Sequence, residues 1–116
     1  MELREIYTQL NGNYDSVLGR LCSEVRIKKY LIKFMDANMS IRIFDALKAG
    51  DYETAFIESH NLKGVCANLN LDQLKMSASA LTEALRGGKP EGDITDLVEK
   101  MQKDYEMTAK ALQNLK

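Results

Sequence analysis

The chain has 116 residues, of which 45% are hydrophobic and 28% are charged. These values are ordinary for one globular domain, and they exclude the disordered and low-complexity classes. Sixteen Lys and Arg residues against seventeen Asp and Glu leave a net charge of −1. That near-balance argues against a dedicated nucleic-acid binder, because such a protein needs a surplus of basic residues.

The sequence contains no recognisable membrane span or signal peptide, and no set of residues that could form a zinc-type metal site. No apolar stretch approaches the roughly 20 residues of a membrane span, and the start of the chain does not have the form of a signal peptide. The two cysteines, Cys22 and Cys66, lie far apart, and the chain has one histidine, so no zinc-type ligand set forms. We therefore expect a cytoplasmic protein with reduced thiols, no membrane contact and no metal of its own.

The N-terminal part of the sequence predicts short amphipathic helices over residues 2–10 and 14–22. One proline and seven glycines in the chain favour helices joined by few breaks, and no sustained strand-like alternation is present. Ser23 is a good N-cap for a third helix. Ser40 is expected to cap the next helix, and Gly50 to end it.

The remaining residues predict three longer helices. Asp51 is the expected N-cap of the first, and Asn70 can adopt the left-handed turn into the second. The clearest loop is residues 87–92, after which Asp93 is expected to cap the last helix. We predict an all-α fold, an antiparallel up-and-down four-helix bundle with short extra N-terminal helices. Its main helices would be 23–49 (with a possible break near Asn38), 51–69, 71–86 and 93–115.

The helix over residues 51–69 has two different faces. An ideal helix turns about 100° per residue, which places the predicted core-facing residues on one stripe. If Leu62 and Cys66 lie at the centre of that stripe, His60 points roughly 140° away from it, towards solvent. The predicted core-facing stripe consists of Tyr52, Ala55, Ser59, Leu62, Cys66 and Leu69.

The stripe around His60 is unusual for a solvated helix face. It contains Phe56, Ile57, Lys63, Gly64 and Ala67. A glycine inside a helix costs about 1 kcal/mol relative to alanine, and a bare backbone near the imidazole would let another molecule approach closely. The lysine, three residues after the histidine, would neutralise and hydrogen-bond a phosphoryl group carried on the imidazole.

The segment Ser59-His60-Asn61-Leu62-Lys63-Gly64 resembles the His-x-x-Lys-Gly signature of histidine phosphotransfer (HPt) domains, the intermediate carriers of bacterial multistep phosphorelays. The flanking residues 46–52, 55, 56, 69–71 and 74 are also similar to the family pattern, although Asn70 stands where a glycine is common. The resemblance is good from about Leu31 to Arg86. It implies one HPt-like domain over 1–116, with residues 1–22 as a helical cap and 23–116 as the bundle.

The resemblance implies roles for individual residues. His60 matches the phosphoacceptor, Lys63 the residue that stabilises the phosphoryl group, and Gly64 the small residue that leaves space for a receiver domain. Thr82 aligns where many relatives have a glutamine, and its shorter side chain would reach the histidine only through water. We expect Thr82 to share a docking surface with Gly64 and the apolar residues of its stripe, namely Phe56, Ile57 and Ala67.

For Phe56 and Ile57 a second interpretation stays open, in which they are partly buried under a neighbouring helix. Cys66 is expected to fill the core without a catalytic role.

The implied function is phosphotransfer in two-component signalling. His60 would accept a phosphoryl group from the aspartate of a receiver domain and pass it to another receiver. Response-regulator receiver domains are the implied partners, with a hybrid sensor histidine kinase as a further candidate, and we expect the carrier to be a monomer. We expect no intrinsic cofactor, since the receiver would supply Mg²⁺, and no ATP-dependent kinase activity, because no Walker-type loop is present.

The alternative is a helical adaptor that binds receiver or kinase domains without carrying phosphate.

Overall fold

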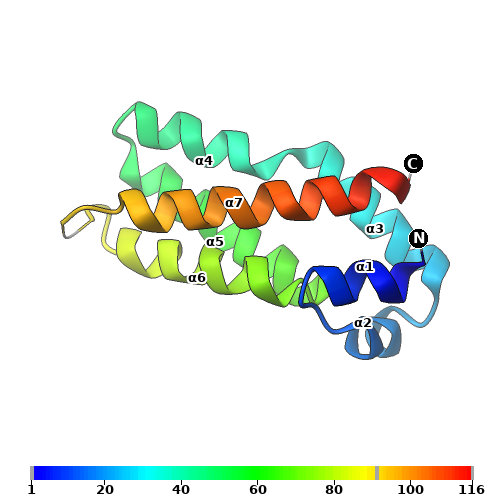
Figure 1. Ribbon diagram of the computed structural model, residues 1–116. Coiled ribbons are helices and arrows are strands. Elements are labelled where there is room, and N and C mark those ends of the chain that lie inside the picture. Colours follow the sequence, from blue (N-terminus) through cyan, green and yellow to red (C-terminus); the bar gives the residue numbers. More distant parts are fainter. Residues whose placement is uncertain (1, 91, 116) are drawn as a thin grey trace.

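A computed structural model describes residues 2–90 and 92–115, and all regular secondary structure within them is helical (Figure 1). Met1, Glu91 and Lys116, which the sequence analysis assigns to the cap, the loop and the bundle, lie outside the described residues. The expected all-α class is confirmed. The elements are α1 (Leu3–Gln9), α2 (Tyr14–Leu21), α3 (Glu24–Ala37), α4 (Met39–Lys48), α5 (Tyr52–Leu69), α6 (Asp72–Leu85), α7 (Thr95–Leu112) and the 3₁₀ turn η1 (Gln113–Leu115).

Hydrogen bonds and backbone angles confirm several of the expected helix ends. The side chains of Ser23 and Asp51 each accept a hydrogen bond from the backbone N–H three residues further on, at 3.2 and 3.1 Å. Such caps satisfy N–H groups that have no partner inside the helix. Gly50 after α4 and Asn70 after α5 have φ angles of 71° and 53°, the left-handed conformation that commonly follows a helix.

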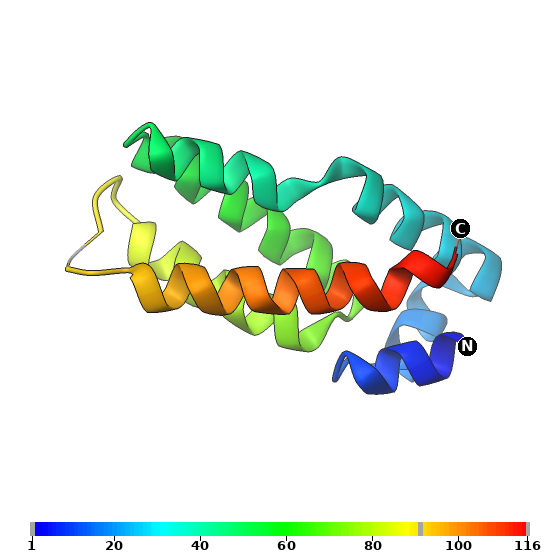
Figure 2. The ribbon, with the colours of Figure 1, turned by 45° about the horizontal axis from the view of Figure 1, so that its top comes forward.

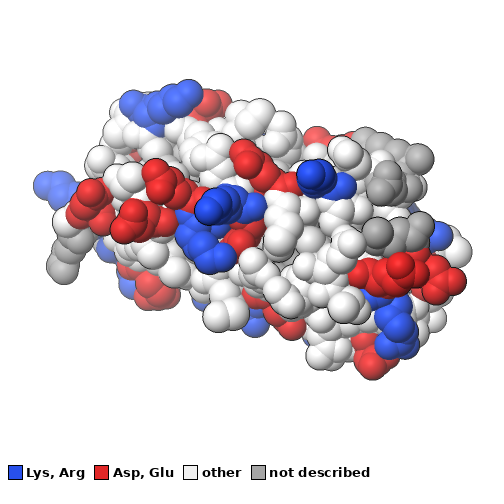
Figure 3. All heavy atoms as spheres, in the orientation of Figure 1, with Lys and Arg blue, Asp and Glu red and all other residues white. Residues whose placement is uncertain are grey.

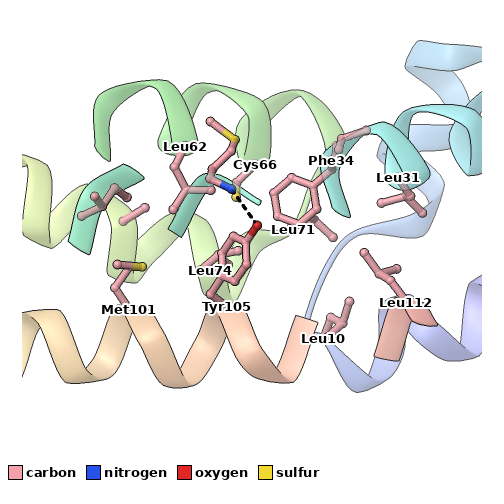
Figure 4. Packing of buried hydrophobic residues seen from close by; sticks show 14 of the residues in the cluster. Leu10, Leu31, Phe34, Leu62, Cys66, Leu71, Leu74, Met101, Tyr105 and Leu112 are labelled. Atoms are coloured by element: carbon pink, nitrogen blue, oxygen red, sulfur yellow. Dashed lines mark hydrogen bonds between the residues drawn. The ribbon is translucent and has the colours of Figure 1, made fainter. Parts of the chain in front are cut away.

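The start of α4 differs from the expectation. Asn38 has a φ of 46° and separates α3 from α4, which begins at Met39, so the expected cap at Ser40 is wrong. Ser40 instead lies inside the helix and is buried. The backbone N–H of Met39 donates a 3.0 Å hydrogen bond to the hydroxyl of Tyr105 in α7, drawn as a dashed line in Figure 4. A side chain that is distant in sequence thus takes the place of a local cap.

The last helix begins two residues later than the expected cap position. The Asp93 carboxylate accepts a 2.9 Å hydrogen bond from the backbone N–H of Thr95, the first residue of α7. Hydrogen bonds from Thr95 also lower the pKa of the Asp93 carboxyl. Asp93 therefore stabilises the start of α7, although Ile94 lies between it and the helix.

Helices α4 to α7 lie side by side in chain order (Figures 1 and 2). The α5 helix packs against α4 and α6, and α6 also packs against α7. Beyond the break at Asn38, α3 contacts α5 and α7. This arrangement gives α5 a neighbour on each flank and leaves the side opposite the core facing outward.

The core lies between these helices and continues under α1. From α5, Leu62 and Cys66 point into the same interior as Met101 and Tyr105 of α7 (Figure 4). The ring of Phe34 lies 5.6 Å from that of Tyr105, measured between ring centroids, and joins α3 to the same core. The residues buried almost completely include Ile6, Leu10, Ile27, Leu31, Ile43, Leu62, Leu71, Leu74, Leu81, Leu85 and Met101.

The two N-terminal helices hold the C-terminal end of α5. Arg20 of α2 donates hydrogen bonds to the carbonyl oxygens of Ala67 and Asn68, at 2.9 and 3.1 Å. Those carbonyls lie in the last turn of α5, where too few helical N–H groups follow to donate to all of them. At Gly12, a Cβ atom would lie 2.5 Å from the backbone oxygen of Asn70, so only glycine fits where the chain passes this turn. The N-terminal segment thus supports the end of α5 beyond Ala67.

Candidate functional site

Helix α5 buries one face and exposes another. Ala55, Ser59, Leu62, Cys66 and Leu69 are buried, as the sequence predicted, and Tyr52 is half-buried. His60 is exposed, so its expected direction away from the core is confirmed. We call the outward face of α5 the His60 surface; it consists of Phe56, Ile57, His60, Lys63, Gly64 and Ala67.

The imidazole of His60 has one aromatic neighbour. The ring of Phe56, one helical turn earlier, lies at an interplanar angle of 20° to it, with 6.1 Å between the ring centroids. Phe56 itself is half-buried and packs against the edge of the core. The imidazole therefore rests beside a fixed apolar ring and keeps its outer side open to solvent.

The N-terminal helices do not cover the histidine. Their hydrogen bonds to α5 reach Ala67, Asn68 and Leu69, which lie about two turns or more after His60. A partner protein can therefore reach the imidazole without displacing α1 or α2.

Lys63 places a cation close to the histidine. It is half-buried and follows His60 by three residues, the spacing at which two side chains lie next to each other on a helix. Its charge also reaches Glu83 of α6. The pKa of the Glu83 carboxyl is lowered, first by a hydrogen bond and the charge of Arg86, and further by the charge of Lys63. The charge of Lys63 thus acts both beside the imidazole in the helical repeat and on the acidic side chain of α6.

Gly64 leaves a gap in the side-chain cover of α5. It is exposed in the interior of the helix, and a Cβ atom built on it would meet no other heavy atom within 4 Å. Packing inside the protein therefore does not require a glycine here. The bare backbone is available for close contact with another molecule.

The remaining docking candidates do not all share this surface. Ile57 is 51% exposed, and Ala67 is half-buried beside it along the helix. Thr82 is fully buried, and its hydroxyl donates a 2.7 Å hydrogen bond to the carbonyl of Ala78 within α6. Thr82 therefore does not lie on the docking surface as expected, because its side chain points into the bundle and its hydroxyl is already bonded to its own helix.

The structure adds two residues to the site that the sequence analysis did not identify. Arg86 of α6 places its guanidinium carbon 5.4 Å from the centroid of the Phe56 ring, and it forms a salt bridge of 2.7 Å with Glu83. The i, i+3 spacing of this acid and base on one helix was visible in the sequence. Their position beside Phe56 was not, because it depends on how α5 and α6 align.

The outer face of α7 shows what an ordinary solvated surface looks like in this protein. Figure 3 shows acidic and basic side chains mixed along it, and its exposed residues include Asp96, Glu99, Lys100, Gln102, Lys103 and Glu106. The His60 surface instead combines apolar residues with one imidazole, one ammonium group and an uncovered glycine. This contrast distinguishes the outward face of α5 from that of α7.

In the described part of the chain, no three His, Cys, Asp or Glu side chains come together in a way that could hold a metal ion.

Cys66 is buried, and burial raises the pKa of its thiol to about 12, so it is protonated at neutral pH. Cys66 therefore fills the core and does not supply a thiolate nucleophile.

Comparison with known proteins assigns the class. The family model of the Hpt domain matches residues 34–115, which include the whole of α4 to α7. The chain therefore belongs to the Hpt domain family, a family that implies histidine phosphotransfer in phosphorelays with receiver domains. Searches of curated proteins and of solved structures found no significant match. None of the helices in the described residues combines the length and apolar character needed to cross a lipid bilayer.

Proposed function

We propose that this protein is a histidine phosphocarrier. His60 accepts a phosphoryl group from the phosphorylated aspartate of one receiver domain and passes it to the aspartate of another. Helices α4 to α7 act in this proposal as the antiparallel four-helix bundle that presents His60. The two cysteines are not in disulfides, which fits a reducing compartment, and we place the exchange in the cytoplasm.

The chemical step needs only a nucleophile and charge stabilisation from this chain. A lone pair on one imidazole nitrogen attacks the phosphorus of the acyl phosphate. The P–O bond to the aspartate breaks, the aspartate leaves as a carboxylate, and a P–N bond forms on His60, while the proton on the other ring nitrogen remains. The second transfer reverses these events on another aspartate.

Lys63 is proposed to stabilise the phosphoryl group once it is on the histidine. An ammonium group can form a charge-assisted hydrogen bond to a phosphoryl oxygen, which is stronger than a neutral one. The divalent metal of the reaction, Mg²⁺, is expected from the receiver domain. No residue of this chain is assigned to it.

One observation supports the proposal most directly: the single imidazole of the chain is exposed next to a helix position that carries no side chain. A receiver domain must bring its aspartate to the histidine within bonding distance. The open backbone at Gly64, one turn away, gives room for that approach.

Phosphoryl exchange with a receiver domain tests the proposal. The purified protein is mixed with several receiver domains labelled on their aspartates, and label that is labile to acid and stable to alkali is followed on this chain. Transfer is expected to the native protein and not to His60→Gln. Label on the His60→Gln variant, or receivers that bind but never transfer, would overturn the carrier in favour of another nucleophile or of an adaptor.

A further inference from the structure

Four side chains, those of His60, Phe56, Arg86 and Glu83, form a continuous line across the contact between α5 and α6. The imidazole of His60 lies nearly parallel to the ring of Phe56, with 6.1 Å between centroids. The guanidinium carbon of Arg86 lies 5.4 Å from the centroid of that same ring. The Nε–H and Nη2–H groups of Arg86 donate hydrogen bonds to the two carboxylate oxygens of Glu83, at 3.1 and 2.7 Å. Each member of the line thus contacts the next.

These contacts restrict how the imidazole of His60, the proposed nucleophile, can rotate. An exposed histidine rotates about two side-chain bonds, and only some orientations direct a ring nitrogen towards an incoming phosphorus. Phe56 is half-buried and packed against the core, so its ring is held in place. A fixed ring that stacks on the imidazole restricts its rotation and leaves the opposite side of the ring open.

Arg86 acts on the position of Phe56 from the α6 side. A planar guanidinium packs on an aromatic ring and is attracted to it. The two hydrogen bonds to Glu83 fix the plane of the guanidinium, which a single contact would leave free to turn. Glu83 thus restrains the guanidinium of Arg86, and that guanidinium in turn restrains the ring of Phe56.

We infer that Phe56 and Arg86 are positioning residues that orient the His60 imidazole for in-line attack, with Glu83 holding Arg86 in place. This inference rests on the proposed function, because it concerns the orientation of the same nucleophile. It assigns Phe56 a role within the free carrier. That role differs from a contribution to docking, because it operates without any receiver domain.

A small phosphodonor separates orientation from docking. With phosphoramidate as the donor, the P–N bond of the donor breaks, ammonia leaves, and a new P–N bond forms to His60. No protein partner takes part. We expect Phe56→Leu to slow this reaction about three- to tenfold, which is the factor that corresponds to the loss of one aromatic pair. Phe44→Leu makes the same change at another half-buried phenylalanine, in α4, and should leave the rate unchanged.

A spectroscopic signal reports the stacking itself. The chain has one histidine, so the imidazole carbon-bound protons are assigned without ambiguity by NMR. The Phe56 ring current should shift these protons in the native protein, and the shift should disappear in Phe56→Leu and remain in Phe44→Leu. Phe56→Tyr keeps the ring and should restore both the shift and the native rate.

The role of Arg86 is tested by a substitution at Arg86 itself, which is exposed, so that the change should not impair folding. Arg86→Gln should slow phosphorylation by phosphoramidate about two- to threefold and reduce the ring-current shift, because the ring loses its outer support. Arg42→Gln, at an exposed arginine in α4, is the matched control and should have neither effect.

The outcomes separate this inference from the proposed function. If native protein is phosphorylated on His60 and both Phe56→Leu and Arg86→Gln react at the native rate with native proton shifts, the positioning role is refuted and the carrier stands. If neither phosphoramidate nor any receiver phosphorylates His60 of the native protein, the carrier function itself fails.

Discussion

The hydroxyl of Tyr7 in α1 donates a 2.7 Å hydrogen bond to the backbone carbonyl of Leu69, the last residue of α5. Both groups are buried, so a carbonyl left without this donor would have no water to replace it. Tyr7→Phe should therefore lower the free energy of unfolding by about 1–2 kcal/mol. Thermal denaturation measures the change, and Tyr30→Phe, at an exposed tyrosine, is the control. An unchanged midpoint for Tyr7→Phe would show that α1 does not stabilise the end of α5.

Gly64 and Gly19 form a matched pair for testing whether a receiver domain comes close to the helix backbone at Gly64. Both are exposed in a helix, and at both a Cβ would meet no heavy atom within 4 Å. Alanine at either position should raise the free energy of unfolding by about 1 kcal/mol, because glycine is the poorer helix former. Phosphoryl transfer from a receiver should stay native in Gly19→Ala, slow in Gly64→Ala and slow by about tenfold or more in Gly64→Leu. Native transfer in Gly64→Leu would refute the close approach.

Replacement of Lys63 should affect the phosphorylated state more than the fold. A hydrogen bond to a charged group contributes about 1.5–3 kcal/mol, so Lys63→Gln should reduce phosphoryl acceptance by about ten- to a hundredfold. Lys103→Gln, at an exposed lysine of α7, should leave acceptance unchanged. Rates are measured with the same labelled receiver. Equal rates for the two variants would remove Lys63 from the proposed mechanism.

Burial of Cys66 predicts a loss of stability at alkaline pH. The pKa of its thiol is raised from 9.0 to about 12 in the folded protein, by desolvation. Above about pH 9 the unfolded chain loses the thiol proton and the folded chain keeps it, so the free energy of unfolding falls as pH rises from about 9 towards 12.

Denaturant unfolding between pH 8 and 10 measures this effect. The native protein should lose stability with a slope of up to about 1.4 kcal/mol per pH unit from this group, and Cys66→Ala should show a shallower slope. The absolute stability of Cys66→Ala is not the relevant quantity, because the substitution also leaves a small cavity. Parallel slopes for the two proteins would contradict the burial argument.

Features that depend on local sequence could be predicted well. The caps at Ser23 and Asp51 and the left-handed Asn70 follow from residue preferences within a few positions. The outward direction of His60 follows from the helical repeat, because α5 is regular from Tyr52 to Leu69.

Features that join distant segments could not be predicted. In the sequence, Asp104 is one charged residue among many in its helix, and nothing there indicates that it is buried. In the structure it is 3% exposed. It accepts hydrogen bonds from Gln73 and Lys100, at 2.8 and 2.9 Å. Pairing across helices decides its burial, as it decides that Tyr105 caps α4 in place of Ser40. The burial of Thr82 has the same origin, since it depends on how α6 packs against α5 and α7.

The most direct test of the account is to locate the phosphoryl group after exchange with a receiver domain. The protein is incubated with a phosphorylated receiver, digested at a pH that preserves phosphohistidine, and sequenced by fragmentation mass spectrometry. The account predicts the added mass on His60, in a yield that falls in Lys63→Gln and not in Lys103→Gln. Added mass on any other residue, with His60 unmodified, would contradict it.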